Sequence, residues 1–119
     1  MKIKYLNSKV EKQCTSMKEA RKLFGGNELL ARSLHARINS LESAECIKDI
    51  IVLPTLHFHK LQGKDEGFFA IDVKTRRDPW RLILQPLKEN EEGYIFCKID
   101  EIADAVKIVG VREVSKHYE

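Results

Sequence analysis

The residue types that can do chemistry gather in the middle of the chain. His57 and His59 stand two residues apart, and Lys60, Lys64 and Arg81 follow them. Residues i and i+2 of a strand share one face, so the two histidines could hold a metal ion together. A metal site needs a third ligand, and no Asp, Cys or His cluster has the spacing to supply it. We therefore expect neither a metal ion nor another cofactor.

Other common catalytic arrangements are absent from the sequence. Gly25-Gly26 falls between two predicted helices instead of between a strand and a helix, which disfavours a dinucleotide or phosphate-binding loop. No Ser or Cys lies in a nucleophile-elbow context. The cysteines Cys14, Cys46 and Cys97 are odd in number, widely spaced and without a Cys-x-x-Cys pair. This pattern disfavours a disulfide framework or a zinc ribbon, and favours small buried core residues.

Length and composition are those of one ordinary domain. The chain has 119 residues, of which 43% are hydrophobic and 33% charged, so we expect a single domain over 1–119 with one core. No apolar run approaches the ~20 residues needed to cross a bilayer. The first residues, Met-Lys-Ile-Lys-Tyr, have no apolar signal region behind their charges. We expect a cytoplasmic protein with no membrane partner.

The charges are unevenly distributed along the chain. Residues 1–37 carry nine Lys and Arg against three Asp and Glu, whereas residues 89–104 carry six acidic residues and only Lys98 as a base. A basic face is the electrostatic footprint of polyanion binding. The alternative is the ordinary solvated surface of a helix.

Local patterns predict how the elements that position these residues are ordered. Residues 2–6 alternate polar and apolar, as in a short strand. Ser16 begins a Ser-x-x-Glu capping box, which predicts a helix over 16–24 that ends at the Gly-Gly pair. Asn27 is a good N-cap for a second helix over 27–42, whose apolar residues recur every three or four positions.

Short segments in the second half alternate or cluster apolar residues as strands do. The predicted elements there are a short helix near 43–50 and strands at 68–74, 80–86, 94–99 and 105–111. The predicted fold class is therefore α+β: an N-terminal strand and an α-helical hairpin packed on a mostly antiparallel sheet of four to five strands.

The segment 57–84 resembles a known family. It reads His-Phe-His-Lys-Leu-Gln-Gly-Lys, then Gly-Phe-Phe-Ala-Ile-Asp-Val, then Trp-Arg-Leu-Ile-Leu. The RelE/ParE superfamily of bacterial toxins, and its HigB-like branch most closely, carries a "His-Lys-Leu-x-Gly" loop, a "Gly-x-(Tyr/Trp/Phe)-Ser-Ile-x-Val" strand and a "Trp-Arg-Ile" strand in this order. The resemblance spans the chain, and its specific motifs lie in 59–84.

The resemblance implies a ribosome-dependent mRNA endonuclease with the fold of small microbial ribonucleases. The family uses no metal: the RNA 2′-hydroxyl attacks the adjacent phosphate and the 5′-oxygen leaves. Such proteins are held inactive by a cognate antitoxin, here expected to be a helix-turn-helix, HigA-like protein. The ribosome and mRNA are the other expected partners.

This chemistry needs a base, an acid and cations aimed at the phosphate. Histidine suits proton transfer because its unperturbed pKa is about 6.5. On the family pattern, the expected catalytic residues are His59, Lys60, Arg81 and His117. The expected RNA- or phosphate-binding residues are His57, Lys64, Arg76, Arg77 and Tyr118. The sequence departs from the family at its C-terminal end, where His117-Tyr118 replaces an "Asp-Tyr-His" order.

Several alternatives stay open at this point. Arg81 could serve catalysis, in which case its loss would reduce activity without unfolding, or it could pair structurally with Asp72 on the neighbouring strand. The whole protein could be a non-catalytic, ParE-like toxin that binds DNA gyrase, or an RNA-binding module. A pocket in which His, Lys and Arg converge favours the nuclease, because a pure binding protein has no use for it.

Overall fold

The computed structural model describes residues 1–94 and 98–116 of the chain. Its helices are α1 (Ser8–Thr15), α2 (Met17–Leu23), α3 (Glu28–Ser43), α4 (Lys48–Ile51) and α5 (Ile99–Ile102), with short 3₁₀ turns η1 (Pro54–Leu56) and η2 (Gly63–Asp65). Its strands are β1 (Lys2–Tyr5), β2 (His59–Lys60), β3 (Phe69–Asp72), β4 (Arg81–Leu87) and β5 (Ile108–Ser115).

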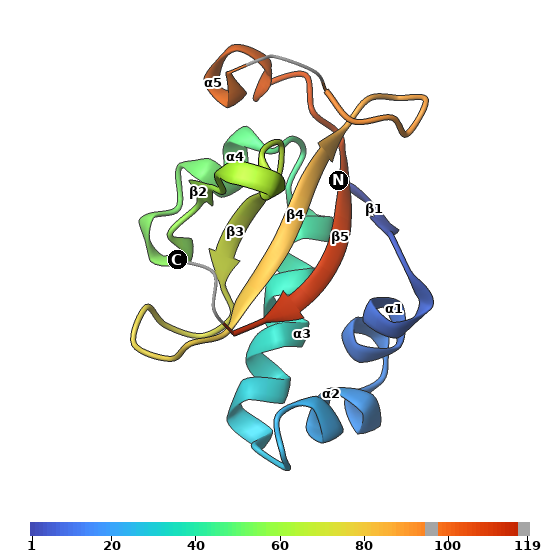
Figure 1. Cartoon of the computed structure of the whole chain (residues 1–119), viewed down its shortest axis with the longest axis vertical. Coiled ribbons are helices and arrows are strands. Elements are labelled where there is room, and N and C mark those ends of the chain that lie inside the picture. Colours follow the sequence, from blue (N-terminus) through green and yellow to red (C-terminus); the bar gives the residue numbers. More distant parts are fainter. Residues whose placement is uncertain (95–97, 117–119) are drawn as a thin grey trace.

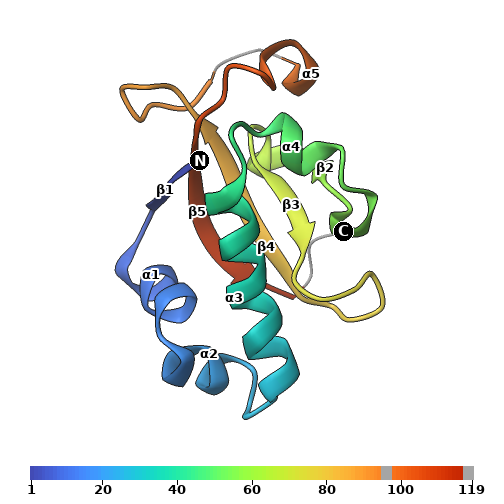
Figure 2. The same ribbon diagram turned by 180° about the vertical axis from the view of Figure 1, so that it is seen from behind.

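The strands form one five-stranded sheet in the order β1-β5-β4-β3-β2. β1 runs parallel to β5, and the other neighbours are antiparallel. Figure 1 shows this sheet from the side that α1, α2 and α3 leave open, and Figure 2 shows α3 lying across the other side. The predicted α+β class and the mostly antiparallel sheet are confirmed.

The predicted helical hairpin is also confirmed, because its caps work as expected. The Ser16 hydroxyl accepts from the Glu19 amide, and the Asn27 side chain accepts from the Leu30 amide. Gly25 and Gly26 adopt φ angles of 62° and 88°, which glycine reaches without steric cost, and so they end α2. These local signals define the two helices before any tertiary packing is considered.

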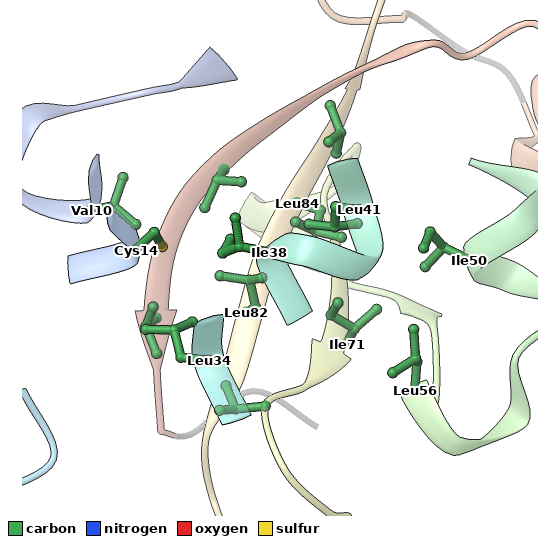
Figure 3. Packing of buried hydrophobic residues seen from close by; sticks show 14 of the residues in the cluster. Val10, Cys14, Leu34, Ile38, Leu41, Ile50, Leu56, Ile71, Leu82 and Leu84 are labelled. Atoms are coloured by element: carbon green, nitrogen blue, oxygen red, sulfur yellow. The ribbon is translucent and has the colours of Figure 1, made fainter. Parts of the chain in front are cut away.

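The main core lies between α3 and the sheet. Leu34, Ile38 and Leu41 project from α3 toward Leu82 and Leu84 of β4 (Figure 3). Burying each such side chain stabilises the fold by roughly 1.5–3 kcal/mol. This packing sets the position of β3 and β4, and therefore of the residues on the opposite face.

Several sequence-based boundaries were wrong. α1 was not predicted, because its apolar side is only Val10 and Cys14, one helical turn apart among polar residues. β2 was not predicted as a strand, since a two-residue edge strand leaves no alternating pattern. The strand predicted at 94–99 fails at its end, where Ile99 already begins α5; residues 95–97 lie outside the described residues.

The last strand runs further than predicted, to Ser115 instead of 111. The register between β4 and β5 shifts between Ile83 and Leu84, so that Glu113 pairs with Ile83 and Val111 with Leu84. Arg112 is the extra residue of this bulge, and it interrupts the apolar alternation that the sequence analysis followed. In the described part of the chain, no helix is long and apolar enough to cross a membrane.

Candidate functional site

The chemically active residues are divided between the two faces of the sheet. Ile71 and Leu82 belong to the core beneath α3, so the adjacent Asp72 and Arg81 point to the face that α1–α3 leave open. His59 shares this open face, because it lies opposite Ala70 in the β2–β3 register. The predicted residues His59 and Arg81 are therefore brought to the same side.

The rings of His57 and His59 lie close together. Their ring centroids are 4.6 Å apart and their planes are tilted by 30°. Nδ1 of His59 lies 2.8 Å from the carbonyl oxygen of His57. A carbonyl oxygen only accepts, so this nitrogen must carry the proton, which leaves Nε2 of His59 as the basic nitrogen.

Asp72 is a charged group in the interior of the fold, with 1% of its surface exposed. Its Oδ1 lies 3.3 Å from Nε of Arg81 and 3.5 Å from Nδ1 of His57. A buried carboxylate needs positive or hydrogen-bonding partners, and these are the ones that face it. The structural alternative for Arg81, pairing with Asp72 across β3 and β4, is confirmed.

Most of the donors of Arg81 are already engaged by the β3–β4 turn. Its Nη1 donates to the carbonyls of Asp78 and Trp80 at 2.7 and 2.8 Å, and its Nη2 donates to that of Arg76 at 3.2 Å. With Nε facing Asp72, a single N–H of Nη2 is left over. Bidentate binding of a phosphate needs two parallel N–H groups, and in this arrangement the guanidinium has only one that is not already used.

The turn above Arg81 exposes two further cations. Asp78 organises it by accepting from the backbone amides of Thr75 and Trp80 at 2.8 and 3.0 Å. Arg76 and Arg77 are exposed on this turn. Both predicted phosphate-binding arginines are thus accessible to a polyanion.

The lysines of the motif lie away from the histidine pair. Lys60 alternates with His59 along β2, so it points to the opposite side of the sheet and lines a cleft of about 540 Å³. Lys64 is exposed on η2. The lining of the cleft, which also includes part of α5, is Lys60, Leu61, Glu66, Gly67, Phe69, Lys98, Ile99 and Asp100.

A further polar cluster on the open face was missed by the sequence analysis. Arg112 lies over the ring of Phe68 at 4.1 Å and pairs with Asp65 at 3.0 Å. Beneath Phe68 lies a small apolar cluster of Leu61, Ala70 and Ile83. Together these contacts hold the segment between β2 and β3 on the sheet. The Arg112–Asp65 pair is separated by 47 positions, so no local sequence motif could predict it.

Two predicted site residues cannot be placed. His117 and Tyr118 lie outside the described residues. Among residues 1–94 and 98–116, no group of three or more His, Cys, Asp or Glu is arranged to hold a metal ion.

Comparison with known proteins supports the fold. No protein-family model and no curated protein sequence matches the chain. Among solved structures, the crystal structure of YafQ from E. coli strain BL21(DE3) matches with a TM-score of 0.51 at 13% sequence identity, covering 97% of this chain and 91% of YafQ. At this identity the likeness concerns the backbone alone, and it shows that the chain has the α+β fold of YafQ.

Proposed function

We propose that this protein is the toxin of a type II toxin–antitoxin system and a metal-independent endoribonuclease that cuts mRNA on the ribosome. The motifs in 59–84 resemble those of the RelE/ParE superfamily and its HigB-like branch. The fold resembles that of YafQ, a RelE-family toxin. Sequence motif and fold are separate observations, and both support the same superfamily.

The observation that carries the proposal is the close pair of histidine rings on the open sheet face. His57 and His59, 4.6 Å apart between ring centroids, stand beside the buried Asp72–Arg81 pair. Imidazoles can exchange protons near neutral pH. His59 is held on the short strand β2, and the contact of its ring with the His57 carbonyl ties the two residues together. The exposed Arg76 on the nearby turn supports binding of the RNA backbone.

In the proposed reaction, a histidine takes the proton of an RNA 2′-hydroxyl. The 2′-oxygen then bonds to the adjacent phosphorus, the bond from phosphorus to the 5′-oxygen breaks, and the leaving oxygen takes up a proton. The products are a 2′,3′-cyclic phosphate and a 5′-hydroxyl. On the family pattern we assign proton transfer and phosphate stabilisation to His59, Arg81 and His117, and RNA binding to His57, Lys64, Arg76, Arg77 and Tyr118. Lys60, the other expected catalytic residue, points to the opposite side of the sheet and is not brought to this pocket. Arg81 would contribute the single N–H that its structural contacts leave over.

The partners follow from the same proposal. A cognate antitoxin, of helix-turn-helix HigA-like type, would neutralise the toxin, and the ribosome would present its mRNA. The basic surface of α1 and α2, with Lys9, Lys12 and Lys18, is one candidate docking surface for a partner of opposite charge. Co-expression with the product of the neighbouring gene should give a complex that survives moderate salt.

The decisive experiment is mRNA cleavage in a bacterial translation extract. Wild-type protein should cut mRNA and leave 2′,3′-cyclic phosphate ends. The double variant His57→Asn/His59→Asn should lose about 10²-fold or more of this activity, the usual contribution of acid–base catalysis. His35→Asn is the matched control, because His35 packs against Gln13 on the helical side and lies outside the proposed site.

Two outcomes would contradict the proposal. One is a folded double variant that cuts mRNA at the wild-type rate. The other is a wild-type protein that arrests growth, leaves mRNA intact and inhibits DNA supercoiling by gyrase, which would favour the non-catalytic toxin.

A further inference from the structure

The two histidines of the pair differ in how a substrate can reach them. Nδ1 of His59 is used by the His57 carbonyl, and its Nε2 is buried without a hydrogen-bond partner among the described residues. The side chain of His57 is 31% exposed. A group that exchanges a proton with RNA must touch the RNA, so the arrangement favours His57 over His59 for this step.

His57 is oriented from beneath by Asp72. Nδ1 of His57 is buried and lies 3.5 Å from Oδ1 of a carboxylate that is 1% exposed. This separation is longer than a typical hydrogen bond, and such contacts often tighten only when substrate binds. A carboxylate only accepts, so it favours a proton on Nδ1 and leaves Nε2 of His57 as the basic nitrogen.

The backbone at His57 provides a second, independent observation. Its φ and ψ angles are 50° and 52°, in the left-handed region, where it ends η1. A non-glycine residue rarely adopts this conformation and keeps it only when its surroundings hold it. Here Leu56 is buried immediately before His57, and the His59 ring bonds the His57 carbonyl. The chain thus maintains an unfavourable conformation that places this imidazole over Asp72.

We propose that His57 is the catalytic base of the reaction and that Asp72 and His59 are its positioning residues. This inference rests on the proposed function. It moves the role of the base from His59, to which the family pattern points, to His57. Nε2 of His57 takes the 2′-hydroxyl proton as the 2′-oxygen bonds to phosphorus and the bond from phosphorus to the 5′-oxygen breaks. The leaving oxygen takes its proton from water.

The proposed role of His57 gives the buried Asp72 carboxylate a function. When His57 gains the proton it becomes a cation, and the Asp72 carboxylate stabilises that cation at short range. Among residues 1–94 and 98–116, the titratable or charged groups that face His57 are Asp72 and His59, with Arg81 on the far side of the carboxylate. Replacing Asp72 by the isosteric Asn removes the negative charge and keeps an oxygen for Nε of Arg81.

The test combines a structural measurement with kinetics. Nitrogen-15 NMR of the imidazole rings at about pH 8 should find His57 protonated on Nδ1 in the wild type, and shifted toward the ordinary Nε2 form in Asp72→Asn. In the mRNA cleavage assay, His57→Asn should lose about 10²-fold or more in rate with KM little changed. Asn tolerates the left-handed region, so this variant should remain folded. His35→Asn should match the wild type.

The pH profile separates electrostatic positioning from structural support. The pH dependence of cleavage should differ between Asp72→Asn and the wild type, because the imidazolium that forms at His57 during the reaction loses its carboxylate. A purely structural role would lower the rate equally at every pH. His59→Asn should lose less activity than His57→Asn, since His59 acts through the His57 backbone.

Each failure has a distinct meaning. If wild-type protein cuts mRNA and folded His57→Asn cuts it equally well, the inference is wrong and the nuclease proposal stands. If His57 carries its proton on Nε2, the role of Asp72 is wrong. If wild-type protein cuts no RNA, the proposed function fails, and the base assignment fails with it. Should Asp72→Asn not fold, the wild-type tautomer and the His57→Asn rates still decide the proposal.

Discussion

The two faces of the central sheet are stabilised by different means. The face beneath α3 is covered by a continuous cluster of aliphatic side chains, among them Leu34, Leu41 and Leu82. The open face has a small apolar cluster and, beside it, the buried charges Asp72 and Arg81. An apolar core tolerates substitutions that keep its volume, whereas buried charges require specific partners. One face therefore supplies stability, and the other holds a polar geometry that chemistry can use.

The largest effect should come from breaking the polar face at Arg81. Arg81→Ala would leave Asp72 buried without its cation and would deprive the carbonyls of Asp78 and Trp80 of their donors. Removing one partner of a buried ion pair costs about 3–5 kcal/mol. Urea unfolding should show a loss of this size, and Arg81→Lys should recover only part of it because Lys lacks the planar fork.

A structural role for Arg81 predicts lost stability in Arg81→Ala, whereas a purely catalytic role predicts lost activity in a folded protein. If the variant unfolds at the wild-type urea concentration, the turn contacts contribute little to stability. A purely catalytic role for Arg81 would then regain support. Arg77→Ala is the matched control on the same turn, since its side chain is exposed and stability should barely change.

The apolar face should be nearly as sensitive at its centre. Leu34 is fully buried between α3 and the sheet, and Leu34→Ala leaves a cavity that the neighbours fill only in part. Such changes cost about 2–5 kcal/mol. Leu29, which is 61% exposed on the same helix, is the control, and its replacement by Ala should leave the urea midpoint nearly unchanged. Equal effects at the two positions would contradict the packing described for α3.

The contrast between the faces also explains how much the sequence could predict. The helices over 16–24 and 27–42 are encoded by caps and apolar spacing, which are local, and the prediction of both was confirmed. The Asp72–Arg81 pairing follows from strand register, and it was foreseen as an alternative because the two strands were predicted as neighbours. The close approach of the His57 and His59 rings depends on a left-handed backbone at His57, for which no local signal exists.

Long-range contacts were beyond prediction for the same reason. Arg112 meets Phe68 and Asp65 only because a bulge in β5 turns it toward the segment between β2 and β3. Neither the bulge nor its partner can be inferred from spacing along one segment. The roles of His59, Lys60 and the other proposed site residues stay predictions until cleavage is measured.

A smaller effect should follow from loosening this contact on the open face. Arg112→Met keeps an apolar stem over Phe68 but removes the cation and its ion pair with Asp65. Cation–π and partly exposed ion-pair contributions are each about 0.5–1 kcal/mol, so we expect a loss of about 1–2 kcal/mol. Amide hydrogen exchange should quicken in the 61–68 segment more than in α3. Uniform quickening along the chain would mean that Arg112 supports the whole sheet instead of this segment.

The smallest effect should come from an ion pair of the opposite kind, exposed at the sheet edge. Glu91 faces Lys4 and Lys2 at 3.1 and 3.2 Å, and hydrogen bonds and charge from Lys4, then Lys2, lower the pKa of Glu91 below its usual value. Because the folded pKa is the lower one, this contribution is present at neutral pH and is lost as the pH falls through the folded pKa. Glu91→Gln should therefore be slightly less stable than wild type at about pH 7 and equal to it at strongly acidic pH. Added salt should remove the difference at neutral pH, because exposed charges are screened. Urea unfolding at both pH values checks this. A salt-insensitive loss as large as that of Arg81→Ala would show that the edge strand β1 depends on Glu91 as the open face depends on its buried pair.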